Sequence, residues 1–168
     1  MLFPKLSNYQ KILNLISVFF IGIFIIRFMG ELAVSNYGWD LDHEMYFGQR
    51  LISGELLYTR EMHDKLPFIQ ILFAVPAYFK SVRLWVILST LINLIAAYLL
   101  RKTLIKIIYQ AFASISIKDI NLISNLSTSF YLFSFANTPG HLHMINQFAA
   151  ALCILSIHFL VNSSLSKN

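Results

Sequence analysis

Residues 12–26 read ILNLISVFFIGIFII, fifteen consecutive uncharged and mostly apolar residues between Lys11 and Arg27. A transmembrane helix needs about 20 predominantly apolar residues, and the FMG that follows Arg27 extends the run to that length. The run is too long for a removable signal peptide and lacks a small-residue cleavage site. It therefore predicts an uncleaved first span at about 12–33, with the N-terminus in the cytoplasm because Lys5 and Lys11 precede it.

The rest of the chain repeats this apolar character. Hydrophobic residues make up 57% of the sequence and charged residues 12%, a composition that points to membrane rather than water. Residues 120–166 contain no Asp, Glu, Lys or Arg, and the turn-like ANTPGHLHMIN divides this long run. We expect an all-α integral membrane helical bundle in one domain, with about four transmembrane helices at residues 12–33, 84–102, 119–136 and 147–161.

One apolar segment, LPFIQILFAVPAYF at 66–79, is short for a span. As a helix it measures roughly 21 Å, against a hydrocarbon core of about 30 Å, and it carries Pro76 internally. If it crossed the membrane, the cluster of Arg101, Lys102 and Lys106 would lie outside. If it lies in the interface, every strong cationic cluster falls inside, which the positive-inside bias favours.

We prefer the interfacial reading, which leaves an outer loop at about 34–82. Two interfacial helices are expected in this loop, at 42–53 and 67–79. Residues 103–118 either extend the second span or form a cytoplasmic interfacial helix. The expected location is the plasma (inner) membrane, crossed several times.

The net charge of +5 does not indicate nucleic acid. The basic residues are thinly spread and bracket the apolar runs, which is how positive charge anchors spans on the cytoplasmic side. Cys153 is the single cysteine, so the sequence holds no disulfide framework. This composition implies membrane lipids as partners and does not imply nucleic acid.

Seven of the eight acidic residues fall within 34 residues of the outer loop region, from Glu31 to Asp64. In this region HEMYFGQRLIS predicts a short helix with Asp42 as its N-cap, Glu44 in the first turn and Gly54 at its end.

Tyr46 and Arg50 follow Asp42 at i+4 and i+8 and should lie near one face of that helix. Phe47 and Leu51 are expected to dip into the lipid surface. The aromatic residues that flank the loop predict an interface belt; they are Tyr37, Trp39, Tyr78 and Trp85.

The loop has the residue types for chemistry at a membrane surface. A carboxylate at a helix start, such as that of Asp42, can accept a proton from an incoming hydroxyl. Nearby cations, among them Lys65, Arg50 and Arg60, can hold a phosphate that stays attached to a lipid. The competing interpretation is that these side chains are solvated charges on an outer loop.

The order of the loop motifs narrows these alternatives. Asp42 is followed by Tyr46, then by the stretch Leu51-Ile52-Ser53-Gly54 through Tyr58, then by Lys65-Leu66-Pro67-Phe68. This order resembles the first outer loop of the C-type superfamily of membrane glycosyltransferases, in the family 39-like branch. That branch includes the protein O-mannosyltransferases and the lipid A aminoarabinose transferases. The resemblance covers roughly residues 12–150.

The resemblance implies an enzyme that transfers a hexosyl or pentosyl group from a polyprenyl-phosphate-linked donor to an acceptor on the outer face of the membrane. It assigns Asp42 as the acid that activates or orients the acceptor, with Asp40 as the alternative because the stretch reads D-L-D. Lys65 would contact the donor phosphate. The substrate-binding set that this implies is Lys65, Arg50, Tyr46, Tyr58 and Arg60.

The sequence departs from the family in three respects. Leu66 stands where the family motif has its first proline. The second outer loop, NTPGHLHMIN, has no acidic residue. His141 and His143 could offer imidazoles to a divalent metal, but an H-x-H pair without a third ligand is weak evidence for a metal site. No cofactor is therefore expected. Family members are also much longer, so the resemblance implies a truncated or split transferase whose further spans come from a partner chain.

Two other classes of function stay open. The chain could be a non-catalytic small membrane protein, either a remnant or an accessory subunit. A transporter or channel subunit is less favoured, because its polar residues sit in a loop rather than inside the spans, where conduction would need them.

Overall fold

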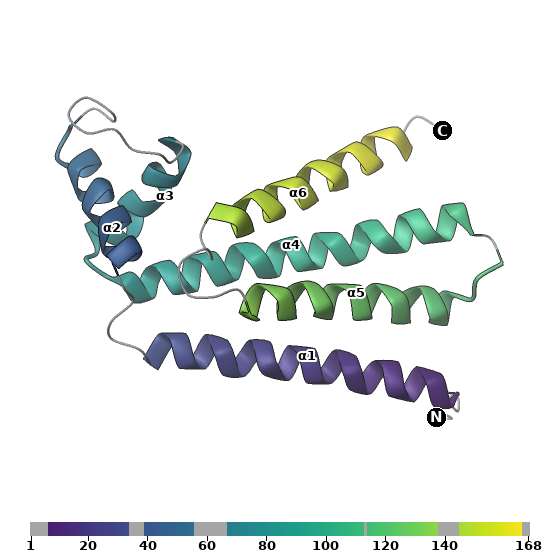
Figure 1. Ribbon diagram of the computed structural model, residues 1–168. Helices are drawn as coiled ribbons and strands as arrows, with labels where there is room; N and C mark the ends of the chain where they lie inside the picture. Colours follow the sequence, from purple (N-terminus) through teal and green to yellow (C-terminus); the bar gives the residue numbers. More distant parts are fainter. Residues whose placement is uncertain (1–6, 34–38, 56–66, 113, 138–144, 166–168) are drawn as a thin grey trace.

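The computed structural model describes residues 7–33, 39–55, 67–112, 114–137 and 145–165 (Figure 1). The all-α prediction is confirmed for these residues, which contain helices and no strand. Each range predicted as a span or an interfacial helix coincides with a helix. The six helices are α1 (Asn8–Ala33), α2 (Trp39–Ile52), α3 (Pro67–Tyr78), α4 (Val82–Ala111), α5 (Ile117–Asn137) and α6 (Ile145–Leu165).

Four long helices lie side by side in the spatial order α1, α5, α4, α6, and form a row (Figure 1). α1 and α5 run in one direction, and α4 and α6 run in the other. α2 and α3 form an antiparallel hairpin at the end of the row where α4 begins. The start of α1 and the end of α6 lie at the opposite end, together with the α4–α5 turn.

Aromatic and small side chains pack the first three helices of the row. The Phe20 ring of α1 stacks on Phe133 of α5, with centroids 4.6 Å apart. Phe24 of α1 joins Ala97 of α4 and Leu132 of α5 in one buried cluster. Small residues such as Ala97 allow neighbouring helices to approach and pack closely.

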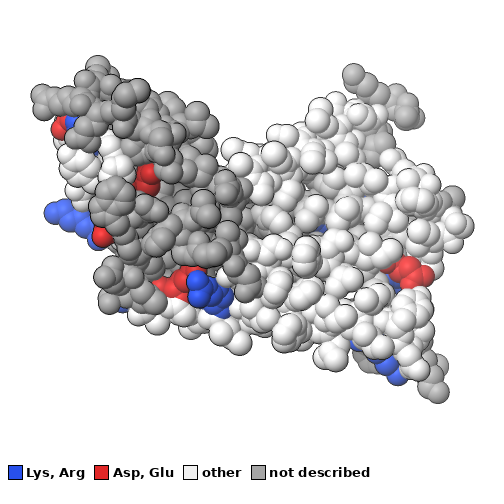
Figure 2. Space-filling view, viewed as in Figure 1, with Lys and Arg blue, Asp and Glu red and all other residues white. Residues whose placement is uncertain are grey.

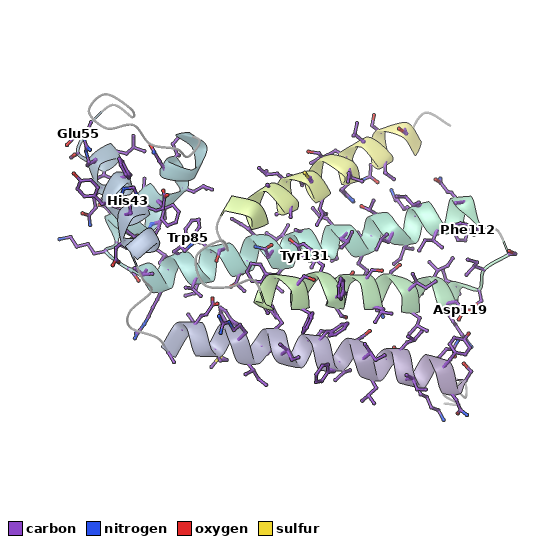
Figure 3. All side chains as sticks on the ribbon, in the orientation of Figure 1. His43, Glu55, Trp85, Phe112, Asp119 and Tyr131 are labelled. Carbon is purple, nitrogen blue, oxygen red and sulfur yellow. The ribbon has the colours of Figure 1, made fainter. Side chains whose placement is uncertain are left out.

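Hydrogen bonds between side chains connect α4 to α5. The Tyr131 hydroxyl donates to Asn93 Oδ1 at 2.6 Å, between the two helices (Figure 3). Further along, Arg101 Nε donates to Asn125 Oδ1 at 2.7 Å and its Nη2 to Asn121 Oδ1 at 3.2 Å. Arg101 therefore connects α4 to α5 through two side chains of α5 that are one turn apart.

A second chain of hydrogen bonds connects α4 to α6. Thr103 Oγ1 donates to the Leu99 carbonyl at 2.8 Å and lies 2.8 Å from His158 Nδ1. Because the hydroxyl has one hydrogen, it accepts from His158, so Nδ1 carries the proton. His158 Nε2 then accepts from Asn162 Nδ2 at 2.8 Å, and Asn162 Oδ1 accepts from Lys106.

The single acidic residue outside the outer-loop region, Asp119, has a structural role at the start of α5. Ser116 Oγ accepts from the Asp119 N–H at 3.2 Å and donates to Asp119 Oδ2 at 2.7 Å, which caps the helix. Asp119 Oδ1 accepts from Tyr9 Oη at 2.8 Å and from Gln10 Nε2 at 3.0 Å. These bonds fasten the first turn of α1 to the first turn of α5 (Figure 3).

Among the described helices, α1 and α4 are long and apolar enough to cross a membrane. Their 26 and 30 residues correspond to about 39 and 45 Å. α4 continues past the predicted boundary at residue 102, so residues 103–111 extend this helix and do not form a separate one. α5 and α6 coincide with the third and fourth predicted spans, and whether they cross a membrane remains a prediction.

Candidate functional site

The hairpin begins with α2, whose end is a glycine turn. Gly54 has φ +86°, its N–H donates to the Leu51 carbonyl at 3.1 Å, and the Glu55 N–H donates to the Arg50 carbonyl at 3.1 Å. This pair of bonds is the Schellman motif, which favours glycine at the left-handed position. The predicted end of the helix at Gly54 is thus confirmed, and α3 starts at Pro67 as predicted.

α2 and α3 cross closely at Gly48. A Cβ at this position would lie 2.6 Å from the Phe73 carbonyl oxygen and 3.0 Å from Ala77 Cβ, so only glycine fits. The contact continues into a buried cluster of Met45, Phe73, Ala77 and Trp85. Trp85 of α4 stacks on Phe73 with centroids 4.0 Å apart and is 3% exposed. Its predicted place in an interface belt is therefore wrong, because it anchors the hairpin to the row (Figure 3).

The turn from α3 into α4 also fixes the hairpin. Lys80 adopts φ +50°, and its N–H donates to the Ala77 carbonyl at 3.0 Å while the Ser81 N–H donates to the Pro76 carbonyl at 3.0 Å. Ser81 Oγ then accepts from the Leu84 N–H at 3.3 Å and caps α4. Lys80 thus ends α3 and the next residue, Ser81, caps α4, so the turn between the two helices has little conformational freedom.

Asp42 lies on an exposed face of α2, with Tyr46 one turn further on. Tyr46 is 48% exposed, and Arg50 follows at the next turn of the same face. The predicted role of Asp42 as N-cap is wrong, because the helix begins at Trp39 and Asp42 is its fourth residue. Asp40 is also within α2, and its side chain lies outside the described residues.

Arg50 is held within the hairpin. Its Nε and Nη2 contact Glu55 Oε2 at 2.7 and 2.6 Å, and its side chain is 15% exposed. The guanidinium carbon lies 5.6 Å from the Tyr46 ring centroid and 5.9 Å from that of Phe47. A phosphate could reach Arg50 only in competition with Glu55, a partner that the sequence reasoning missed. The turn at Gly54 was the feature of the sequence that could have indicated this pair, because it brings Glu55 close to Arg50.

Several hairpin side chains are more buried than the sequence suggested. Phe47 is 7% exposed and packs edge-on against His43 at 4.8 Å, so its expected insertion into lipid is wrong. Glu44 is the sixth residue of α2, so its predicted place in the first turn is wrong, and it is 5% exposed. Gln70 of α3 is 1% exposed, and neither of its amide atoms has a hydrogen-bond partner among the described residues. Sequence reasoning assigned no role to Gln70, which lies in a run read as apolar.

The other predicted site residues lie outside the described part of the chain. They are Tyr58, Arg60 and Lys65 in the outer loop, and His141 and His143 between α5 and α6. Within the described ranges, no three His, Cys, Asp or Glu side chains gather closely enough to hold a metal ion.

An apolar cavity of about 250 Å³ lies where α3 meets the row. α4 and α6 form its walls, and α3 contributes Leu72 next to the hairpin core. Such a cavity suits a hydrocarbon chain rather than a sugar, because its lining presents almost no polar atoms. The lining residues are Leu72, Ile92, Ile95, Ala96, Leu99, Ala151, Leu152 and Leu155.

Charged side chains add to the hairpin end of the row. Arg27 Nε lies 3.4 Å from Glu31 Oε1 near the end of α1, and the two side chains are 51% and 32% exposed. Most charged side chains visible in Figure 2 lie toward the two ends of the molecule, with a largely white stretch between them. This distribution fits a protein whose middle faces lipid and whose ends face water.

Comparisons of the chain with protein-family models, with curated proteins and with solved structures give no match. The assignment of a function therefore depends on the residues of the hairpin and on the row that supports them.

Proposed function

We propose that the chain is a glycosyltransferase-like membrane protein that transfers a sugar from a polyprenyl-phosphate donor to an acceptor at the outer face of the membrane. The observation that carries this proposal is the exposed carboxylate of Asp42 on a fixed hairpin. Asp42 shares its face with Tyr46, and contacts at Gly48 and Trp85 fix the hairpin at the end of the row opposite the α4–α5 turn. That end is the outer one if the positive-inside bias holds.

In the proposed reaction the acceptor hydroxyl attacks the anomeric carbon and gives its proton to Asp42. The bond between that carbon and the phosphate oxygen breaks, so polyprenyl phosphate leaves with both bonding electrons. Transfer in one displacement inverts the configuration at the anomeric carbon. Cations that stabilise the leaving phosphate lower the barrier, and the family resemblance assigns Lys65 to this role.

The arrangement around Asp42 supports this scheme in two ways. The apolar cavity between α3, α4 and α6 gives part of the donor's hydrocarbon chain a place beside the hairpin. The rigid α3–α4 turn and the close crossing at Gly48 hold α2 in position, and positioning is a large part of the catalysis of a group transfer.

The test is the release of polyprenyl phosphate from polyprenyl-phosphate-linked sugars by membranes that contain the complete system. Asp42→Asn should reduce release by about 10²- to 10⁴-fold, the usual contribution of a positioned general base. Asp119→Asn is the matched control, because it removes the same charge at the other end of the row and should leave release unchanged. Unchanged release in Asp42→Asn, with Asp40→Asn silent as well, would refute the proposal.

The runner-up is a non-catalytic accessory subunit that pairs with further spans. It is favoured by the apolar side chains exposed on the outermost helices of the row, which either lipid or another chain could cover. Examples are Leu15, Ile26, Phe159 and Leu160. A transporter or channel has less support, because the polar pairs described between helices of the row, such as Asn93 with Tyr131 and Thr103 with His158, bond to each other.

A further inference from the structure

A continuous stripe of exposed side chains runs along α4. Its apolar part contains Leu91 (50% exposed) and Ile95 (58%), followed by Tyr98 (54%). Lys102 and Lys106 continue the stripe, and Tyr109 (67% exposed) ends it. Successive members are three or four residues apart, so they stay on one face of the helix.

The stripe has the order of groups found in a phospholipid. From Leu91 to Lys102 the helix rises about 16 Å, close to half of the roughly 30 Å hydrocarbon core. An acyl chain can therefore lie along Leu91 and Ile95 while a headgroup phosphate reaches the two ammonium groups. Tyrosines on either side of the cations match the preference of tyrosine for the membrane interface.

The charges on the stripe favour an anionic headgroup. Within the described residues the two ion pairs, Arg27 with Glu31 and Arg50 with Glu55, involve neither lysine of the stripe. Lys102 Nζ lies 4.9 Å over the Tyr98 ring, and Lys106 contacts the uncharged Asn162. A phosphate can therefore pair with both cations without displacing a carboxylate.

We infer that this face of α4 binds an anionic glycerophospholipid, with its phosphate between Lys102 and Lys106 and one acyl chain along Leu91 and Ile95. The zwitterionic headgroup of phosphatidylcholine carries a cation of its own and is disfavoured beside two lysines. The surface is remote from Asp42 and shares Ile95 with the apolar cavity beside the hairpin. The phosphate site at Lys102 and Lys106 lies outside that cavity, so its test does not depend on the proposed transfer reaction.

The experiment is a lipid titration of the whole chain in neutral detergent, followed by native mass spectrometry. Dioleoyl phosphatidylglycerol should bind more tightly than dioleoyl phosphatidylcholine. The double variant Lys102→Gln/Lys106→Gln should weaken binding of the first phosphatidylglycerol at least tenfold, since each cation near an anionic headgroup contributes about fivefold. Binding of phosphatidylcholine should not change.

Two controls distinguish a specific lipid-binding surface from nonspecific electrostatic attraction between the protein and anionic lipid. Lys11→Gln/Lys118→Gln removes the same charge from exposed positions off the stripe and should weaken phosphatidylglycerol binding less than about twofold. Asn162→Ala removes the Lys106 contact without a change of charge and should leave binding unaltered. Equal losses in the two double variants, or equal affinities of the wild-type chain for the two lipids, would overturn the inference.

Discussion

Replacement of Gly48 by alanine should loosen the hairpin from within. The added Cβ would lie 2.6 Å from the Phe73 carbonyl oxygen and 2.8 Å from the carbonyl carbon, and neither backbone atom can rotate away. To reach an ordinary contact of about 3.4 Å, α2 and α3 must separate by roughly 0.8 Å. A gap of this size forfeits a quarter to a half of the dispersion energy of the contacts it opens.

The net effect of Gly48→Ala follows from two opposing contributions. Overpacking costs about 1–3 kcal/mol, whereas alanine favours a helix over glycine by up to about 1 kcal/mol. Because the clash is with backbone, we expect a net destabilisation of the hairpin by about 1–2 kcal/mol. Gly22→Ala in α1 is the matched control, since nothing lies within 4 Å of its Cβ position. It should be neutral or stabilising.

Trp85 reports on the hairpin directly, because it stacks on Phe73 in the same buried cluster. In a Trp39→Phe background, Gly48→Ala should shift the Trp85 emission to longer wavelength and increase its quenching by acrylamide. Its local unfolding midpoint in denaturant should fall, while that of Gly22→Ala should not. Identical quenching and midpoints for the two alanine variants would show that the close α2–α3 crossing is incorrect.

Three other perturbations test the turn, the ion pair and the α4–α6 contact. Lys80→Gly should raise the stability of the same transition by up to about 1 kcal/mol, because glycine adopts φ +50° without strain; a loss of stability would contradict the turn geometry. Glu55→Gln should lower stability by less than about 1 kcal/mol, as for a partly exposed pair. The same variant should strengthen binding of polyprenyl phosphate a few-fold if Arg50 contacts the donor, and unchanged binding would remove Arg50 from the site. Thr103→Val should cost about 0.6 kcal/mol by loss of the bond to His158, measured by the thermal midpoint in detergent, and no shift would argue against that bond.

Local rules predicted the parts of the hairpin that depend on a few neighbouring residues. Gly54 ends α2 because the left-handed position favours glycine, and Pro67 starts α3 because a first-turn residue needs no N–H. The N-cap prediction for Asp42 failed because Asp42 matched the local pattern of a cap, while the helix has an earlier start at Trp39. α4 ran past its predicted end because lysine and arginine do not stop a helix.

The sequence pattern did not predict contacts between segments that are distant in the chain. Phe47 and Trp85 look like lipid-facing aromatics in sequence, and they are buried because the hairpin folds onto α4. Gln70 lies in an apolar run, and the sequence pattern did not show that this polar side chain is 1% exposed. The pairing of Arg50 with Glu55 required knowledge of the turn geometry at Gly54.

The central claim is that the hairpin faces the outside of the membrane and the α4–α5 turn faces the cytoplasm. It can be measured by labelling single cysteines in intact cells with a membrane-impermeant maleimide, after Cys153→Ser. Gln49→Cys on α2 and Ser114→Cys in the α4–α5 turn are both at exposed positions. We predict labelling of Gln49→Cys in intact cells, and of Ser114→Cys only after permeabilisation. Labelling of Ser114→Cys in intact cells, or of Gln49→Cys only after permeabilisation, would contradict this orientation and the outer-face site built on it.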